Sequence, residues 1–316
     1  MRKILRVSDD YLAQLAAESR KWGGHLQVEA SGEWHAWLDH PLVARHYQSR
    51  GLLDGLPWET WAGRRLGRPA APSLDLGCGS GLKSLGVFEA GSASELHGID
   101  ISEERIAEAE RMRVEHGIPG QFRVADVNTA ALPPDTYDLI FSNHSFHHFL
   151  ALEHVMAQVH DALKPDGLFI LEEFVGPTQF QWTDAQIDVV RTLMALLPDD
   201  LRMLRWGAVK PHEGRPEVKD VVAASPFESI RSAEILPLFR RFFRIVELRP
   251  LGGTLQHLLY NGIVHNFTLD RRDAVDFVRA IIDVEDALID AAMLPSDFVL
   301  LVGMRRDAGP RAEGRG

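Results

Sequence analysis

The stretch Ser73-Leu-Asp-Leu-Gly-Cys-Gly-Ser-Gly81 decides the fold of this chain. It starts as a short apolar strand that contains Asp75 and then enters a turn with glycine at every second position. Alternating glycines let the backbone pass close beneath a ligand and present its N–H groups at the start of the next helix, where negative charge is favoured. A dinucleotide-binding turn follows G-x-G-x-x-G, and Leu82 occupies its third glycine position here. The stretch therefore predicts a strand, a ligand-binding turn of another kind and a helix, although a glycine-rich turn alone is also compatible with a plain tight connection.

Strand and helix patterns alternate from about residue 72 to residue 175. Strands are predicted at 73–76, 95–100, 121–126, 137–142 and 167–174, and helices at 102–116 and 150–163. This alternation predicts a parallel sheet with right-handed crossovers. Lys164-Pro-Asp-Gly167 predicts the turn that ends the second helix. Later in the chain, strands are predicted at 242–248 and 298–304, with helical segments at about 253–265 and 271–293.

A polar residue stands at the end of each of the first four strands. They are Asp75, Asp100, Asp126 and Asn143. In an open parallel sheet, ligands bind outside the carboxyl ends of the strands. Asp100 falls where a ribose-binding carboxylate belongs, and Asp126 can accept a hydrogen bond from the amine of adenine. One such acid is more often simply solvated, but three at corresponding strand ends, beside the glycine turn, favour a ligand.

These segments together resemble the class I S-adenosylmethionine (SAM) methyltransferases. The resemblance rests on Asp75-x-Gly-x-Gly-x-Gly81, Gly98-Ile-Asp100, Ala125-Asp126-Val127, Asp138-Leu-Ile-Phe-Ser142 and Leu163-Lys-Pro-Asp-Gly167, in the order and approximate spacing of the family. It covers residues 70–175 firmly and the remaining strands loosely. It implies an α/β, Rossmann-like, doubly wound sheet of seven mostly parallel strands, the last antiparallel, with SAM across its carboxyl edge.

The resemblance also implies a cofactor site. Asp75 and the glycine turn would face the methionine part of SAM, Asp100 the ribose, Asp126 the adenine and Asn143 the methionine end. The cofactor-binding residues expected on this basis are Asp75, Gly77, Cys78, Gly79, Gly81, Asp100, Ile101, Asp126, Val127 and Asn143.

By family analogy, the implied activity is SAM-dependent methylation of an oxygen or nitrogen of a small molecule in biosynthesis, either a specialised metabolite or a sugar. Two alternatives stay open. The fold can bind SAM for a non-methylating reaction such as its intramolecular cyclisation, or it can be a non-catalytic binding module. The intact motifs count against the second alternative.

Three histidines follow the fourth strand, in Asn143-His-Ser-Phe-His-His-Phe149. An amine or hydroxyl acceptor loses a proton during methylation, so a nearby base is useful, and His147, His148 and His144 are the candidates. A similar histidine pair also occurs in the family as part of the loop-to-helix turn. No metal is expected, because adjacent histidines point in different directions and Glu172 and Glu173 face opposite sides of their strand.

The acceptor pocket is predicted from two segments rich in aromatic and amide side chains. The segment 173–182 contributes Glu173, Phe174 and Trp182, and His257 follows the sixth strand. Such side chains are typical of small-molecule pockets, although the segment is equally suited to packing an insertion.

The chain divides into three regions. Residues 1–65 hold five of the seven tryptophans and predict a helical N-terminal extension or lid. Residues 66–306 predict the SAM-binding domain, in which residues 177–235 interrupt the alternation and predict a helical insertion over the strand ends. Residues 307–316 are rich in Gly, Arg and Ala and predict a disordered tail.

Charge and composition limit the partners. The net charge of −11 argues against a nucleic-acid partner and leaves a small-molecule substrate as the expectation. No stretch approaches the roughly 20 apolar residues that a membrane span requires. The single cysteine, Cys78, excludes an internal disulfide and favours a reducing compartment, so a cytoplasmic protein is expected. A homodimer is compatible with the sequence, which does not decide the oligomeric state.

Overall fold

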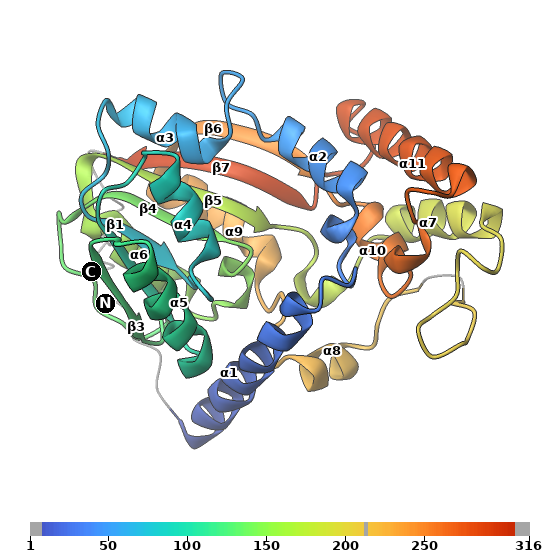
Figure 1. Ribbon diagram of the computed structural model, residues 1–316, viewed down its shortest axis with the longest axis horizontal. Helices are drawn as coiled ribbons and strands as arrows, with labels where there is room; N and C mark the ends of the chain where they lie inside the picture. The colour runs from blue at the N-terminus through green and yellow to red at the C-terminus, as the bar shows by residue number, and fades with distance from the viewer. Residues whose placement is uncertain (1–7, 212–213, 307–316) are drawn as a thin grey trace, which may run out of the picture.

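A seven-stranded sheet forms the centre of the molecule (Figure 1). The computed structural model describes residues 8–211 and 214–306. Within them the strand order is β3-β2-β1-β4-β5-β7-β6. The strands are β1 (Ser73–Leu76), β2 (Leu96–Asp100), β3 (Gly120–Val124), β4 (Tyr137–Asn143), β5 (Leu163–Phe174), β6 (Phe243–Gly252) and β7 (Phe298–Arg305). Only β7 runs antiparallel to its neighbours. The predicted fold is confirmed, including the direction of its last strand.

The reversal of strand order lies beside β1. Ser73 of β1 pairs with Leu96 of β2 on one side and with Leu139 of β4 on the other. The chain first moves outward to β3 and then returns across β1 to begin β4. The crevice at such a switch point, outside the carboxyl ends of the strands, is where open α/β sheets bind ligands.

Helices cover both faces of the sheet, because its central strands are apolar on both sides. Along β4, Leu139 and Phe141 join one core while Ile140 joins the other, as the two-residue period of a strand requires. The first core includes side chains of α2 (Pro41–Arg50), α3 (Trp58–Leu66), α4 (Leu82–Glu89) and α5 (Glu103–Glu115). The second is closed by α6 (Leu152–Ala162) and α9 (Ser232–Phe242).

Two regions outside the alternating pattern lie together. Helix α1 (Asp9–Ala30) runs beside α8 (Val218–Ala224) in Figure 1, although their sequences are far apart. The N-terminal region continues through η1 (Trp37–Asp39). The segment after β5 contains η3 (Thr178–Phe180) and α7 (Asp184–Leu196), and the remaining elements are η2 (Phe146–His148), α10 (Gln256–Tyr260), η4 (Val264–Asn266) and α11 (Arg272–Asp290).

Most element bounds agree with the sequence to within a few residues, and two do not. β5 begins at Leu163, so the predicted turn at 164–167 is a bulge inside the strand, between the pairs Tyr137–Leu163 and Leu139–Leu168. The helix expected over 253–265 is reduced to α10 and η4. The predicted tail, residues 307–316, lies outside the described residues. In the part of the chain that the structure describes, no helix combines the length and apolar character needed to span a membrane.

Candidate active site

The glycine turn after β1 requires its glycines for both conformation and space. Gly77, Gly79 and Gly81 have φ values of +69°, +53° and +83°, a region that other residues adopt rarely. A Cβ atom on Gly77 would stand 2.5 Å from Ser145 Oγ, and one on Gly81 would stand 2.5 Å from Met112 Cε of α5. Gly81 therefore packs the start of α4 against α5, while Gly77 and Gly79 approach the strand ends.

A cavity of about 430 Å³ lies at this edge of the sheet. Nine of the ten cofactor-binding residues predicted from the sequence line it, which are Asp75, Gly77, Cys78, Gly79, Asp100, Ile101, Asp126, Val127 and Asn143. The tenth, Gly81, is outside the lining for the packing reason given above. The strand ends thus converge on one space, which we call the cofactor cavity.

Two carboxylates shape the inner wall of the cofactor cavity. Asp100 accepts the N–H of Gly79 on Oδ2 and the N–H of Ser102 on Oδ1, each at 2.9 Å. Asp75 is buried and accepts the hydroxyl of Ser84 at 2.7 Å. Burial raises the pKa of Asp75 to about 7. Each carboxylate oxygen has further lone pairs, so both groups can still accept hydrogen bonds from a ligand.

Asp126, the predicted adenine contact, already has a partner from the N-terminal region. The hydroxyl of Tyr11 on α1 donates to Asp126 Oδ2 at 2.8 Å, and the N–H of Asn128 donates to Oδ1 at 2.9 Å. Burial and Asp126 hold the pKa of Tyr11 above its usual range, so the phenol stays protonated and remains a donor.

The cavity is covered by a roof that consists of α1 and the segment 225–228. Leu15, Glu18 and Trp22 of α1, together with Phe227, line the cavity from this side. Glu18 is buried and accepts the hydroxyl of Ser225 at 2.7 Å. Burial would raise the pKa of Glu18, but His148, Ser225 and Trp22 outweigh it and lower the pKa to about 2. No motif predicts these individual roof residues. The sequence indicates a cover only through the tryptophan-rich N-terminus and the insertion at 177–235.

Hydrogen bonds to the sheet domain also fix α1. Ser19 Oγ donates to the carbonyl of Ile101 at 3.0 Å, and Arg105 Nε donates to the carbonyl of Trp22 at 2.8 Å. Both partners of α1 follow Asp100, so the roof is attached directly beside the predicted ribose contact. A shift of α1 would therefore disturb the cofactor cavity itself.

The donor set of the cavity fits SAM. Asn143 Nδ2 is buried and has no hydrogen-bond partner in residues 8–211 and 214–306, so an amide donor is left for a carboxylate such as that of the methionine part. Asp100 offers acceptor sites for a diol, and the glycine turn leaves room for close approach. Asp126 can accept an amine only in exchange for one of the four hydrogen bonds that it already accepts from Tyr11, Asn128 and Thr129. The cavity thus offers hydrogen-bond acceptors, one spare amide donor and an apolar cover from Leu15 and Phe227. This combination matches SAM, which is a charged amino acid joined to a nucleoside.

A second cavity, of about 540 Å³, adjoins the first, and we call it the side cavity. The two share Lys83, Asn143 and His144. Apolar residues of the side cavity include Leu38, Leu52, Trp58, Leu251 and Leu300, and its polar residues include Tyr47, Glu59 and Glu172. The shared residues place the side cavity at the end of the cofactor cavity where Asn143 ends β4, which is the end predicted to hold the methionine part.

His144 stands at the junction of the two cavities in a backbone conformation with φ +50°. A positive φ outside glycine is uncommon and is concentrated at functional sites. Its Nε2 lies 3.3 Å from the hydroxyl of Tyr47 and 3.6 Å from Glu172 Oε1. Burial opposes ionisation of Glu172, but Lys83 and His144 hold its pKa well below the usual range. A negative charge therefore faces the imidazole.

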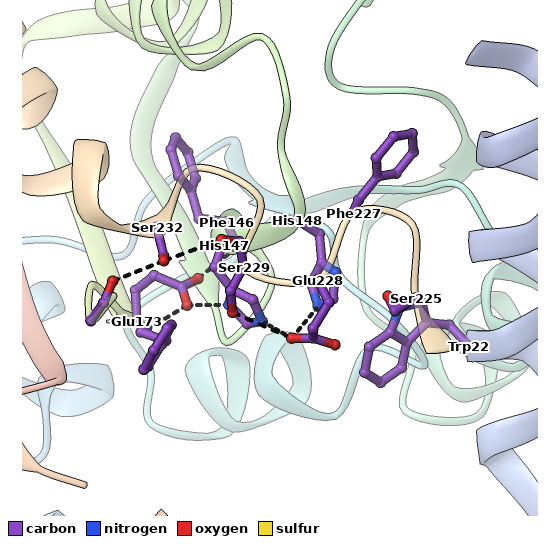
Figure 2. A network of polar contacts seen from close by, with 12 residues as sticks. Trp22, Phe146, His147, His148, Glu173, Ser225, Phe227, Glu228, Ser229 and Ser232 are labelled. Carbon is purple, nitrogen blue, oxygen red and sulfur yellow. Dashed lines mark hydrogen bonds and ion pairs between the residues drawn. The ribbon is translucent and has the colours of Figure 1, made fainter. Parts of the chain in front are cut away.

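His147 and His148 belong to a separate polar network. His147 Nδ1 lies 2.5 Å from Glu173 Oε1 (Figure 2). His148 Nδ1 lies 3.0 Å from Glu18 Oε1. Although burial opposes it, Glu173 and Glu228 raise the pKa of His147 to about 10. Such an imidazole is already protonated at neutral pH and is a poor base. His148 lines the cofactor cavity, whereas His147 is absent from the described linings of both cavities.

The four predicted substrate contacts lie outside both described linings. Glu173 is buried beneath η2, where it accepts the N–H of Phe146 at 2.6 Å. Phe174, Trp182 and His257 pack into an aromatic cluster with Phe180 and Phe298. Burial lowers the pKa of His257 to about 4. The cluster still borders the junction, because the ring centroids of Phe298 and His144 are 5.5 Å apart.

Comparison with known proteins is consistent with this geometry. A family model described as a methyltransferase domain matches residues 68–229. Squalene methyltransferase 1 of Botryococcus braunii is 35% identical over 36% of this chain and 30% of its own length. The mitochondrial arginine-hydroxylase NDUFAF5 of Rattus norvegicus is 30% identical over 34% of this chain and 30% of its own length. The chain thus spans less than a third of the length of these relatives. A solved structure of geranyl diphosphate methyltransferase with GPP and sinefungin shares the fold, at 15% identity and a TM-score of 0.50, over 93% of this chain and all of that one.

Proposed function

The chain belongs to the class I SAM-dependent methyltransferase family, and from that premise we propose that it methylates an oxygen or nitrogen of a small, largely apolar molecule. One observation supports this activity above all. The cofactor cavity, at the ends of the first four strands, meets the side cavity at His144. A cofactor and a methyl acceptor would therefore have adjoining spaces. When bound, SAM supplies an electrophilic methyl group on its sulfonium.

The residues of the cofactor cavity would hold SAM by its polar ends. Asp100 would accept hydrogen bonds from the ribose diol, Asp126 from the adenine amine, and the free amide N–H of Asn143 would bind the carboxylate. This places the methionine end beside His144, where the two cavities meet. Alignment of the two reactants at near-attack distance is the main contribution that an enzyme makes to such a displacement.

The side cavity would bind the acceptor. Its walls include Leu52, Trp58, Leu251 and Leu300, which favour an apolar specialised metabolite over a sugar. The squalene methyltransferase to which this chain is similar is named for an acceptor that is likewise apolar. Glu59 and Glu172 add acceptors that suit a hydroxyl or amine group on that molecule.

His144 would act as the base. Its Nε2 faces Tyr47 and Glu172, which leaves Nδ1 to take the proton of the acceptor O–H or N–H. The carboxylate of Glu172 then faces the imidazolium and stabilises its charge. Of the three candidate histidines from the sequence, we therefore favour His144 as the base. His147 is less suitable because it is already protonated at neutral pH.

We further propose that α1 and the segment 225–228 form a lid. Their contacts cover the cofactor cavity from outside the sheet, and exclusion of water is a common purpose of such covers. In this view the N-terminal region and the insertion act together and close over one cofactor.

Two experiments test the proposal. SAM at about 100 times its dissociation constant should stabilise the purified protein by about 2.7 kcal/mol, seen as a rise in melting temperature. Mass spectrometry of the protein with SAM and a metabolite extract should then show an acceptor that gains one methyl group, together with S-adenosylhomocysteine. Methylthioadenosine alone would indicate cyclisation of SAM. A product that gains a hydroxyl group, as the name of the arginine hydroxylase would suggest, would overturn methyl transfer.

A further inference from the structure

We propose that His147, His148 and Glu228 form a binding site for a divalent transition-metal ion next to the cofactor cavity. Each of the three offers one ligand atom, and these atoms all lie within 4.8 Å of one another. Glu228 Oε1 is 3.5 Å from His147 Nε2 and 4.0 Å from His148 Nε2. Ligands placed about 2.0–2.2 Å from one tetrahedral ion stand roughly 3.4 Å apart. The observed separations therefore need only a small contraction to enclose an ion.

The orientation of the two imidazoles is a second, independent observation. Nδ1 of His147 faces Glu173, while both Nε2 atoms face Glu228 (Figure 2). Nδ1 of His148 faces Glu18. Histidines that bind metals almost always direct their other ring nitrogen to a carboxylate or carbonyl group, which fixes the tautomer. Both histidines have this arrangement, with carboxylates from two different parts of the chain.

Nε2 of His148 has unused binding capacity. This atom is buried and makes no hydrogen bond within the described residues, and Glu228 Oε1 lies 4.0 Å from it. Nδ1 of the same ring, by contrast, faces Glu18 Oε1 at 3.0 Å, and the side chain is only 11% exposed. A buried polar atom without a hydrogen bond costs free energy, and a bound ion would give Nε2 a partner.

The charge of the cluster points to a cation. The side chains of Glu18, Glu173 and Glu228 are 2%, 0% and 14% exposed. Within the described residues, the ammonium group of Lys21 lies 3.3 Å from Glu228 Oε2 and contributes one fixed positive charge. Three carboxylates and this ammonium group leave a net charge of −2 when both imidazoles are neutral. Binding of a divalent ion balances that charge and releases the proton that His147 holds in the ion-free protein, and protonation of both histidines is the competing explanation.

The sequence predicts no metal because the carboxylate of the proposed site, Glu228, is far from the histidines along the chain. The acids considered there were Glu172 and Glu173, on a single strand. The ligand here is Glu228, from the segment between α8 and α9, and the two histidines are close together in η2, with ring centroids 4.2 Å apart. Two imidazoles and one carboxylate suit zinc and its neighbours in the first transition series.

The position of the site gives the ion a role. His148, Glu18 and Phe227 line the cofactor cavity, and Glu18 belongs to α1. An ion held by Glu228 and the histidines would therefore join the roof of the cavity to the end of β4. Its occupancy would control how firmly the roof closes.

The test uses the full chain, stripped of metal by a chelator and titrated with Co²⁺ and with Zn²⁺. We expect one equivalent of each to bind in calorimetry, visible absorption bands from bound Co²⁺, and a melting temperature that rises until one equivalent is added. His148→Ala and Glu228→Gln should each abolish uptake. His116→Ala, which changes an exposed histidine at the end of α5, should leave uptake unchanged.

Two results would overturn the site. One is wild-type protein that takes up neither ion at micromolar concentration while nitrogen NMR shows both imidazoles fully protonated at pH 7. The other is uptake by His148→Ala and Glu228→Gln equal to that of the wild type. Circular dichroism spectra and cooperative thermal unfolding of both variants establish that they are folded. Because no methyl acceptor is needed, failure here is separate from failure of the proposed activity.

Discussion

The floor and the roof of the cofactor cavity are built in different ways. The floor consists of strand ends and the glycine turn, with contacts such as Ser84 to Asp75, nine residues apart, and Gly79 to Asp100. The roof depends on pairs such as Tyr11 with Asp126 and Glu18 with Ser225, which are 115 and 207 residues apart. The floor follows from local sequence, whereas the roof exists only once distant segments have met.

The largest effect is expected where floor and side cavity meet. His144→Ala should lower kcat by about 10²–10⁴-fold, because general bases contribute about this much, while the dissociation constant of SAM stays close to that of the wild type. Steady-state kinetics with the identified acceptor and calorimetry with SAM measure the two quantities. His116→Ala is the control. If His147→Ala lowered kcat more than His144→Ala does, the assignment of His144 as the base at this junction would be wrong.

Next comes the floor itself. Asp100→Ala should weaken SAM binding by about 100-fold or more, because it removes hydrogen bonds to a charged group and also frees the N–H of Gly79 from its partner. Calorimetric titration measures the change. Asp199→Ala, at an exposed carboxylate beyond α7, serves as the matched control. An undiminished affinity would show that the floor does not bind the ribose.

A smaller effect is the pH dependence of SAM affinity, which we expect to come from Asp75 in the floor and not from the roof. Because burial raises the pKa of Asp75 to about 7, this carboxyl is neutral below pH 7 and no longer attracts the ammonium group of SAM. Affinity should be full above pH 7 and about tenfold lower at pH 6. Asp75→Asn should bind weakly with a flat profile over this range, as followed by calorimetry from pH 5.5 to 8. A wild-type profile that is equally flat would contradict the assignment.

The smallest effect concerns the roof. Tyr11→Phe removes one hydrogen bond to Asp126, worth about 1 kcal/mol, so SAM should bind roughly fivefold more weakly. Most of the change should be in the dissociation rate, measured by stopped-flow fluorescence. The tryptophans near α1 provide the signal. A loss as large as that of Asp100→Ala would mean that roof and floor do not differ in the way described.

The sequence predicts the floor well because local sterics determine it. A strand that ends at a glycine turn has few alternatives, so the bounds of β1 and the positions of Asp75, Asp100 and Asn143 follow from spacing. The antiparallel last strand is different, since it came from the family resemblance and not from the residues. The structure confirms the strand.

The roof, the bulge in β5 and the aromatic cluster depend on contacts between segments that are far apart in the sequence. Residue spacing within one segment does not reveal such contacts. Nothing in the run around Glu18 or Glu228 indicates a partner two hundred residues away. The Lys-Pro-Asp-Gly run has the composition of a turn, yet pairing with β4 keeps it in the strand as a bulge. His257 and Trp182 are predicted to contact substrate, whereas in the structure their rings pack against each other outside both described cavity linings.

The separation between Glu18 and Ser225 has a consequence for biosynthesis on the ribosome. Helix α1 leaves the exit tunnel before Ser225, because the hydroxyl that the carboxylate of Glu18 binds is translated 207 residues later. Contacts so distant along the chain form late in folding. The segment 225–228 must therefore emerge before α1 can dock on it, and until then chaperones have access to the apolar side of α1.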